Sequence, residues 1–364
     1  MTKPVYIASL HRPFNQQLKP SKWVCTFLET LNKSIPSSEI LPEFYYYLIQ
    51  TLNKEYQKEL PEVFNGLPSD VAIKNIWDHI HKINNKKKFL SELPNIINDR
   101  KTAIDKQIYS TYKAASYYLN LAKDKFNLIN SKNALTVNGK ALLDIKSNFF
   151  RISQREAAFY FERILEVDFH LFITHCLFIK LGSKYNLKSV VGEQSEFINY
   201  YLKIKHFNFT SSSLSNYNVV RNSWVELLNV LDAKFNLRRK YTDIIKSNIQ
   251  FNAWYNELLL LFKKFENEGF KERMAFVKRK DMFLKIYKQR LKNDKNDLGF
   301  INLHNIKGEM RISAENFQKF LVEFYESEKK IRNIYFSNTV NSIDTRERFY
   351  IRNRPVIKIK IKDK

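Results

Sequence analysis

Proline placement is the feature of this sequence that most restricts what the chain can fold into. Eight of the nine prolines lie at or before Pro94, and the ninth is Pro355. Because proline begins or ends helices and rarely occupies their interior, residues 1–94 are predicted to form short helices. Longer helices are predicted from residue 95 onward.

The pattern of apolar residues predicts a mainly α-helical protein with small β-hairpins, of the α+β class. Apolar side chains recur at spacings of three and four over 99–129, 154–181 and 270–294. The dipeptide Asn138-Gly139 lies between short apolar runs and predicts a hairpin, because both turn positions need positive φ. Three regions are expected: a Pro-rich region 1–94, a central helical domain 95–298 with an embedded hairpin at 134–152, and a small basic α+β module 299–364.

Ser153 and Glu156 predict the start of a long central helix. Their spacing of three residues is that of a capping box, in which each side chain bonds the other residue's amide. The helix is predicted to end at Gly182, because glycine is the common residue just past a helix end.

The net charge of +24 points to a polyanionic partner, since Lys and Arg attract phosphate. Residues 1–70 contain seven basic and seven acidic side chains, so the whole excess lies downstream. Residues 271–295 carry a net +7 and residues 329–364 a net +8. Nucleic acid, either DNA or RNA, is the expected partner of these two segments. The neutral N-terminal region is expected to contact protein partners.

The helix predicted from Phe270 carries the first candidate binding residues. Lys271, Lys278, Lys285 and Lys292 are seven residues apart, so each is rotated by only about 20° from the last and they form one basic ridge. An apolar row of the same period, Phe270, Val277, Leu284 and Leu291, is expected to bury the neighbouring face. A solvated helix face without a partner is the competing interpretation of the ridge.

The C-terminus carries the second set of candidates. Isoleucine and lysine alternate from Ile357 to Lys362, which predicts a strand, and a preceding strand at 346–351 is expected to pair with it. With a three-residue loop, Arg348, Tyr350, Arg352, Lys358 and Lys360 share one face, and Arg354 lies at the tip. This basic ribbon suits a groove or a phosphate backbone. An edge strand protected by lysines is the competing interpretation.

A helix predicted over 313–335, followed by this hairpin, resembles the helix-then-wing order of winged-helix modules. The resemblance lies in the order of elements alone, and it serves here as a geometric model and not as a family assignment.

Two alternatives to a non-catalytic nucleic-acid-binding subunit stay open. Arg163 and His170, with six residues between them, resemble the Arg-x(4 to 6)-His pattern of HEPN ribonucleases, although a core histidine also explains His170. The chain is also rich in Asn, Lys, Ile, Tyr and Phe, the bias of an AT-rich coding sequence. A structural adaptor whose charge reflects that bias is the second alternative.

Other functional classes find little support in the sequence. The seven glycines form no phosphate-binding fingerprint, and the histidine spacings fit no zinc helix, so no cofactor or metal is expected. The two cysteines are 150 residues or more apart and suggest a reducing, cytoplasmic compartment. The most apolar segment, 169–181, is too short to span a membrane, so no membrane partner is expected.

Overall fold

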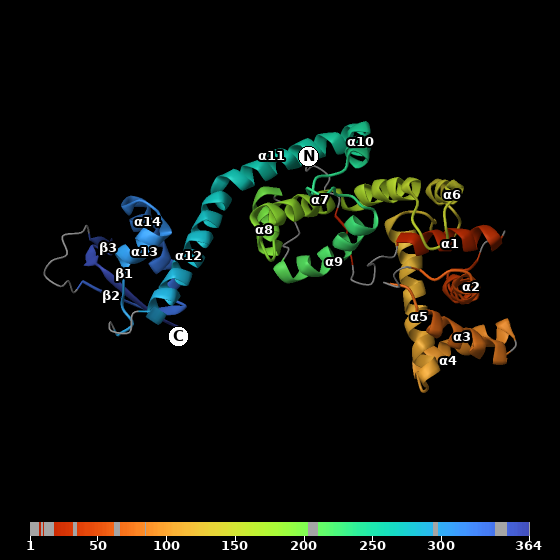
Figure 1. The fold of residues 1–364 in the computed structure, drawn as a ribbon. Helices are drawn as coiled ribbons and strands as arrows, with labels where there is room; N and C mark the ends of the chain where they lie inside the picture. Colours follow the sequence, from red (N-terminus) through yellow and green to blue (C-terminus); the bar gives the residue numbers. More distant parts are fainter. Residues whose placement is uncertain are drawn as a thin grey trace. The chain divides into compact units, whose positions relative to one another are not determined.

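The computed structural model describes residues 7, 8, 10, 18–31, 35–61, 66–83, 85–202, 210–293, 298–338 and 348–363. This part of the chain is mainly helical with a few short antiparallel strands, so the predicted α+β class is confirmed (Figure 1). The chain divides into two compact units, Met1–Lys263 and Lys264–Lys364, called unit 1 and unit 2 below. The sequence predicts domain boundaries after residues 94 and 298. Whether those three regions fold separately stays a prediction.

Unit 1 begins with helices of 14 to 18 residues, which are longer than the short helices that the proline pattern predicts. They are α1 (Leu18–Leu31), α2 (Ile40–Tyr56), α3 (Asp70–Ile83), α4 (Lys86–Asp99) and α5 (Ala103–Asn120), the last followed by a π-helical turn (Leu121–Lys125). Pro20 and Pro42 lie in the first turns of α1 and α2, where the backbone needs no amide donor. Pro94 lies inside α4 and does not end that helix, contrary to expectation.

Helix α7 (Gln154–Tyr185) is the long central helix of unit 1. The Ser153 hydroxyl accepts from the Glu156 amide at 3.2 Å and the Glu156 carboxylate accepts from the Ser153 amide at 2.9 Å, which confirms the predicted capping box. The predicted end at Gly182 is wrong, because the left-handed residue that closes the helix is Asn186 (φ 53°). Polar Asn tolerates this conformation better than most side chains.

The other helices of unit 1 follow or surround α7. They are α6 (Val137–Asp144), α8 (Val191–Glu196), α9 (Ser211–Leu227), α10 (Arg239–Ser247) and α11 (Ile249–Phe265), with a π-helical turn at Phe197–Leu202. Within α7, Asp168 has non-helical angles, and its carboxylate pairs with the fully buried Arg221 of α9 at 2.7 Å. The Ala8 amide donates to the same carboxylate at 2.9 Å, which fixes the chain near residue 8 onto this kink.

The predicted hairpin at 134–152 is wrong. Residues 137–144 form α6, and Asn138-Gly139 lies in its first turn, where the Thr136 hydroxyl accepts from the Gly139 amide at 3.2 Å. Gly139 is needed for close packing, because a Cβ at this position would lie 2.2 Å from the Leu128 carbonyl oxygen. A tertiary contact, and not a turn, therefore explains this glycine.

Unit 1 contains one local structure twice. The Asn130 and Asp232 side chains, 102 positions apart, each accept hydrogen bonds from the amides two and four residues later, at 2.8–3.0 Å. Each loop also contains one antiparallel bridge, Ile129 with Leu135 and Leu231 with Leu237. Each loop lies between two helical segments. Unit 1 therefore contains a repeated helix-loop-helix element, at 121–144 and 211–247.

Unit 2 has an order of helices and strands different from that of unit 1 (blue in Figure 1). Its elements are a π-helical turn (Glu266–Phe270), α12 (Lys271–Asn293), β1 (Ile301–Asn302), α13 (Leu303–Met310), α14 (Ala314–Glu328), β2 (Arg332–Ser337), β3 (Phe349–Ile351), β4 (Arg354–Val356) and β5 (Lys358–Asp363). Strands β1, β5 and β2 form one antiparallel sheet in that order, and β3 pairs with β4. The core contains side chains from α12, α13, α14 and all five strands.

Two details of unit 2 differ from expectation. The helix predicted over 313–335 ends at Glu328, and residues 332–337 form β2. The C-terminal strand β5 pairs with β2 and β1, and not with the strand that precedes it. Strand β3 instead pairs with β4 through a two-residue turn, Arg352-Asn353, in which both φ values are positive (48° and 62°). The predicted three-residue loop is therefore wrong.

Candidate nucleic-acid interface

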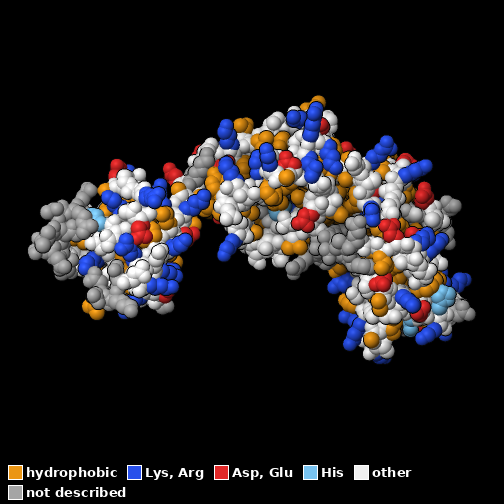
Figure 2. Space-filling model, in the orientation of Figure 1, with side chains coloured by type: hydrophobic (Ala, Val, Ile, Leu, Met, Phe, Trp, Pro, Cys, Tyr) orange, Lys and Arg blue, Asp and Glu red, His pale blue; other side chains and the backbone are white. Residues whose placement is uncertain are grey.

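All ten predicted binding residues lie in unit 2, but they lie on several of its faces. Figure 2 shows Lys and Arg side chains scattered with acidic side chains among them over the visible face of each unit. The ten candidates therefore do not form one surface, and each face of unit 2 has its own set of basic residues.

The lysine ridge of α12 points away from the core. Lys278, Lys285 and Lys292 are exposed, whereas Phe283 and Ile286 on the same helix are buried. At 100° per residue, the ridge lies on the side of α12 opposite these buried residues. The Lys271 side chain lies outside the described part of the chain.

The predicted apolar row beside the ridge is wrong in part. Phe270 is buried, but Val277 and Leu291 are 37% and 41% exposed. The helix instead buries Phe283, Ile286 and Tyr287, which are spaced by three and one and so form the side that meets the core. The lysines of α12 therefore repeat every seven residues, but the buried apolar residues of this helix do not.

The β3–β4 hairpin carries four of the candidates and packs on α14. The Gln318 side chain accepts from the Tyr350 amide at 2.8 Å and donates to the Tyr350 carbonyl at 2.7 Å. Arg352 pairs with Glu326 of α14 at 3.2 Å and stacks on Tyr325. Arg348 and Arg354 are exposed. The hairpin is therefore held by α14, and its arginine at the turn is partly neutralised there.

Strand β5 carries the other candidates on a different sheet. Lys358 and Lys360 are half-buried, and they alternate with Ile359, which is fully buried in the core. Since β5 pairs with β2, these lysines share a face with β2 residues and not with Arg348 and Tyr350. The predicted common face for the hairpin and this strand is wrong.

The outward side of this sheet is strongly basic. On β5 it presents Lys358, Lys360 and Lys362. The paired positions on β2 are, in register, Ser337, Tyr335 and Asn333. We call these six residues the lysine sheet face. None of these six side chains is a carboxylate.

A bridge of contacts joins the C-terminal end of α12 to β5. The Tyr287 hydroxyl accepts from the Ile361 amide at 3.0 Å and donates to the Gly299 carbonyl at 3.2 Å. The Lys360 ammonium donates to the Leu298 carbonyl at 2.6 Å. These contacts attach the core-facing side of α12 to β5, whereas the lysine ridge lies on the opposite side of that helix and the β3–β4 hairpin lies against α14.

The solvent face of α14 has the opposite charge. Its exposed ionisable side chains within 314–328 are three glutamates and one lysine: Glu315, Lys319, Glu323 and Glu326. Hydrogen bonds from Lys329 and Arg352 hold the pKa of Glu326 below its usual range, so this carboxylate stays ionised at neutral pH. Glu315 pairs with Lys319, and Glu326 pairs with Lys329 and Arg352, so this face offers a phosphate backbone little net attraction.

One buried carboxylate connects three elements of unit 2. Glu328, 4% exposed, accepts from Lys280 of α12 at 3.1 Å and from Arg332 of β2 at 2.8 Å. Burial opposes ionisation, but the hydrogen bonds from Arg332 and Lys280 hold its pKa below the usual value. Lys280 and Arg332 therefore serve the fold and contribute little to the outer surface.

The ribonuclease alternative gains no supporting geometry. Arg163 pairs with Glu166 at 2.7 Å, and His170 is half-buried against Phe169 and Trp254. The kink at Asp168 separates the two residues along α7. The hypothesis stays a prediction.

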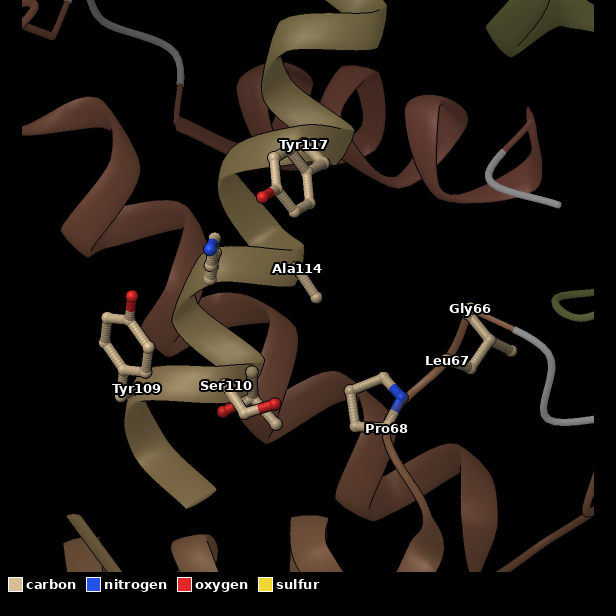
Figure 3. Close-up of a pocket in the computed structure, with 9 residues that line it drawn as sticks. Gly66, Leu67, Pro68, Tyr109, Ser110, Ala114 and Tyr117 are labelled. Carbon is tan, nitrogen blue, oxygen red and sulfur yellow. The ribbon is translucent and has the colours of Figure 1, made fainter. Parts of the chain in front are cut away.

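A pocket of about 430 Å³ lies in unit 1 between α5 and the segment 66–68 (Figure 3). Tyr109, Ser110, Ala114 and Tyr117 of α5 lie across from Pro68. The lining residues of this pocket include no carboxylate, histidine or cysteine. The ionisable side chains of the lining are those of Tyr109, Lys113 and Tyr117.

Four residues of the lysine sheet face are absent from the candidates that the sequence predicts: Asn333, Tyr335, Ser337 and Lys362. Asn333 and Tyr335 were assigned to the end of a helix. The available signal was the alternation Asn333-Ile334-Tyr335-Phe336-Ser337, in which every second side chain faces the core.

No family model, curated protein or solved structure matches this chain. Across the described ranges, every helix is too short or too polar to cross a bilayer.

Proposed function

We propose that this chain is a nucleic-acid-binding protein without catalytic activity of its own, acting as a subunit or adaptor of a larger nucleoprotein assembly. The observation that carries the proposal is the lysine sheet face, which has three lysines among its six residues. Surfaces of this kind bind phosphate by charge and by release of counterions. The neutral N-terminal region is left to contact protein partners.

The order of elements in unit 2 supports a winged-helix-like module. Helices α13 and α14 are joined by a three-residue turn, 311–313, and are followed by strands that include a hairpin. This order of elements resembles that of a helix-turn-helix with a following wing. The acidic solvent face of α14 argues that this module contacts nucleic acid with a surface other than its second helix.

The buried free thiols Cys25 and Cys176 support a reducing compartment, and we place the protein in the cytoplasm.

The salt dependence of oligonucleotide binding tests the proposal. Fluorescence anisotropy with labelled 30-nucleotide DNA, RNA and duplex probes is measured from 50 to 300 mM KCl. Affinity is expected to fall steeply with salt. The triple variant Lys278→Gln, Lys285→Gln, Lys292→Gln is expected to reduce the slope of log K against log salt by about 2 to 3, since each lost phosphate contact removes about 0.7 to 0.9.

The matched control removes three exposed lysines from unit 1: Lys74→Gln, Lys132→Gln and Lys246→Gln. It is expected to leave the slope unchanged. No binding at 50 mM KCl, or binding without salt dependence, would overturn the proposal and favour an adaptor whose charge reflects codon bias.

A further inference from the structure

The lysines of the lysine sheet face are spaced regularly along β5, as is needed to contact successive phosphates of a nucleic-acid strand. Lys358, Lys360 and Lys362 are alternate residues of β5, so their side chains repeat roughly every 7 Å along one side of the sheet. The other side of the strand faces the core through Ile359 and Ile361. Because the isoleucines are packed in the core, the three lysine side chains all point to the outward side of the sheet.

An aromatic ring lies in the middle of this row. Tyr335 is paired directly with Lys360 in the sheet and is 48% exposed. Directly paired residues place their side chains about 5 Å apart on the same face. The Lys360 ammonium also lies 5.5 Å from the centre of the Phe300 ring. Lys360 is thus in contact with the Phe300 ring and is the strand neighbour of Tyr335.

We propose that the lysine sheet face binds single-stranded nucleic acid, with a base stacked on Tyr335 and phosphates bound by Lys358 and Lys362. The proposal rests on the proposed function and names its substrate class and contact residues. Lys360, which already bonds the Leu298 carbonyl and lies over the Phe300 ring, acts as a positioning residue beside Tyr335.

Single strands fit this face better than a duplex does. An exposed ring can stack only on a base whose face is free, and bases in a duplex are already stacked on their neighbours. Reading a duplex in its groove needs a protruding helix or ribbon that tolerates phosphate on both sides. The solvent face of α14 bears three glutamates and one lysine, which disfavours insertion of this helix into a groove.

The test compares Tyr335→Thr with wild-type full-length protein on labelled 20-nucleotide single strands and on the matching duplex. Threonine keeps the strand preference and removes the ring. Single-strand affinity is expected to fall roughly 5- to 150-fold, the range of one lost base stack, and duplex affinity less than about twofold. Far-UV circular dichroism confirms that the variant is folded.

Two double variants with the same loss of charge distinguish binding by the lysine sheet face from binding by α14. Lys358→Gln with Lys362→Gln is expected to lower the single-strand salt slope by about 1.4. Lys319→Gln with Lys330→Gln, an equal loss of charge at and just after α14, is expected to leave the slope unchanged.

The possible failures are distinguishable. If wild-type protein binds single strands and Tyr335→Thr binds them equally well, the inference is overturned while the proposed function stands. A preference for duplex that α14 variants abolish also overturns it. If wild-type protein binds no probe, both proposals fail together.

Discussion

His175 of α7 is the residue whose ionisation most clearly affects stability. It is 3% exposed, and its Nε2 atom lies 2.7 Å from Asn222 Oδ1. Burial lowers the pKa of His175 from 6.5 to about 4, because the charged ring cannot be solvated there. The unfolded chain therefore binds a proton at a higher pH than the folded chain does. The stability that this difference provides is present above about pH 6.5 and is lost as the pH falls toward 4.

Urea unfolding of wild-type protein and His175→Gln at pH 7 and pH 5 checks this prediction. Glutamine retains a polar group for Asn222 and does not titrate. Wild-type protein is expected to lose about 2 kcal/mol more unfolding free energy between the two pH values than the variant loses. Equal losses in both proteins would show that His175 is not the titrating group.

At the scale of elements, local signals in the sequence predict helix starts well and tertiary pairing poorly. The capping box at Ser153 needs only residues within one turn, so its prediction is confirmed. The alternation in β5 likewise predicts a strand. Its partner β2 could not be identified, because strand pairing depends on contacts distant in sequence and the helical pattern of α14 runs into β2 without a proline or glycine.

The candidate site likewise has one part that the sequence predicts and one part that it does not. The lysines of α12 and β5 are visible as spacings in the sequence, but which of them share a face depends on the pairing of β5 with β2. Tyr335 was missed for that reason. The two-residue turn at Arg352-Asn353 differs from the predicted three-residue loop, because neither residue is glycine, although Asn accepts positive φ.

Glycine 139 provides a test of how α6 packs in the repeated helix-loop-helix element. Helix propensity alone predicts that Gly139→Ala stabilises the protein by up to about 1 kcal/mol. The Leu128 carbonyl oxygen, 2.2 Å from the position of the new Cβ, reverses that sign. We expect a loss of about 1 to 3 kcal/mol, measured by urea unfolding.

Gly192→Ala in α8 is the matched control, because nothing lies within 4 Å of its Cβ position. It is expected to leave stability equal or higher. Equal effects of the two substitutions would contradict the packing described for α6.

At the scale of the whole molecule, the two compact units differ in their tryptophans, cysteines and charge as well as in fold. All four tryptophans and both cysteines lie in unit 1, and the candidate interface lies in unit 2. Tryptophan fluorescence therefore reports on unit 1 alone. The charge is divided similarly, with the neutral first 70 residues in unit 1 and both strongly basic segments in unit 2.

Phe283→Ala tests whether the units unfold separately. Phe283 is fully buried in the core of unit 2 and contacts the rings of Phe320 and Phe324. The substitution is expected to destabilise unit 2 by about 3 to 5 kcal/mol, measured by hydrogen exchange of α14. The tryptophan fluorescence midpoint is expected to stay unchanged. Val277→Ala, at an exposed position of the same helix, serves as control, and a shifted fluorescence midpoint in Phe283→Ala would show that the units unfold together.

Photocrosslinking of a single-stranded oligonucleotide to the full-length protein, followed by peptide mass spectrometry, tests the central claim most directly. The account predicts that the crosslinked peptides contain residues of unit 2, foremost Tyr335 and Phe300, and that added salt suppresses the crosslinks. Crosslinks confined to unit 1, or none under conditions of low salt, would contradict it.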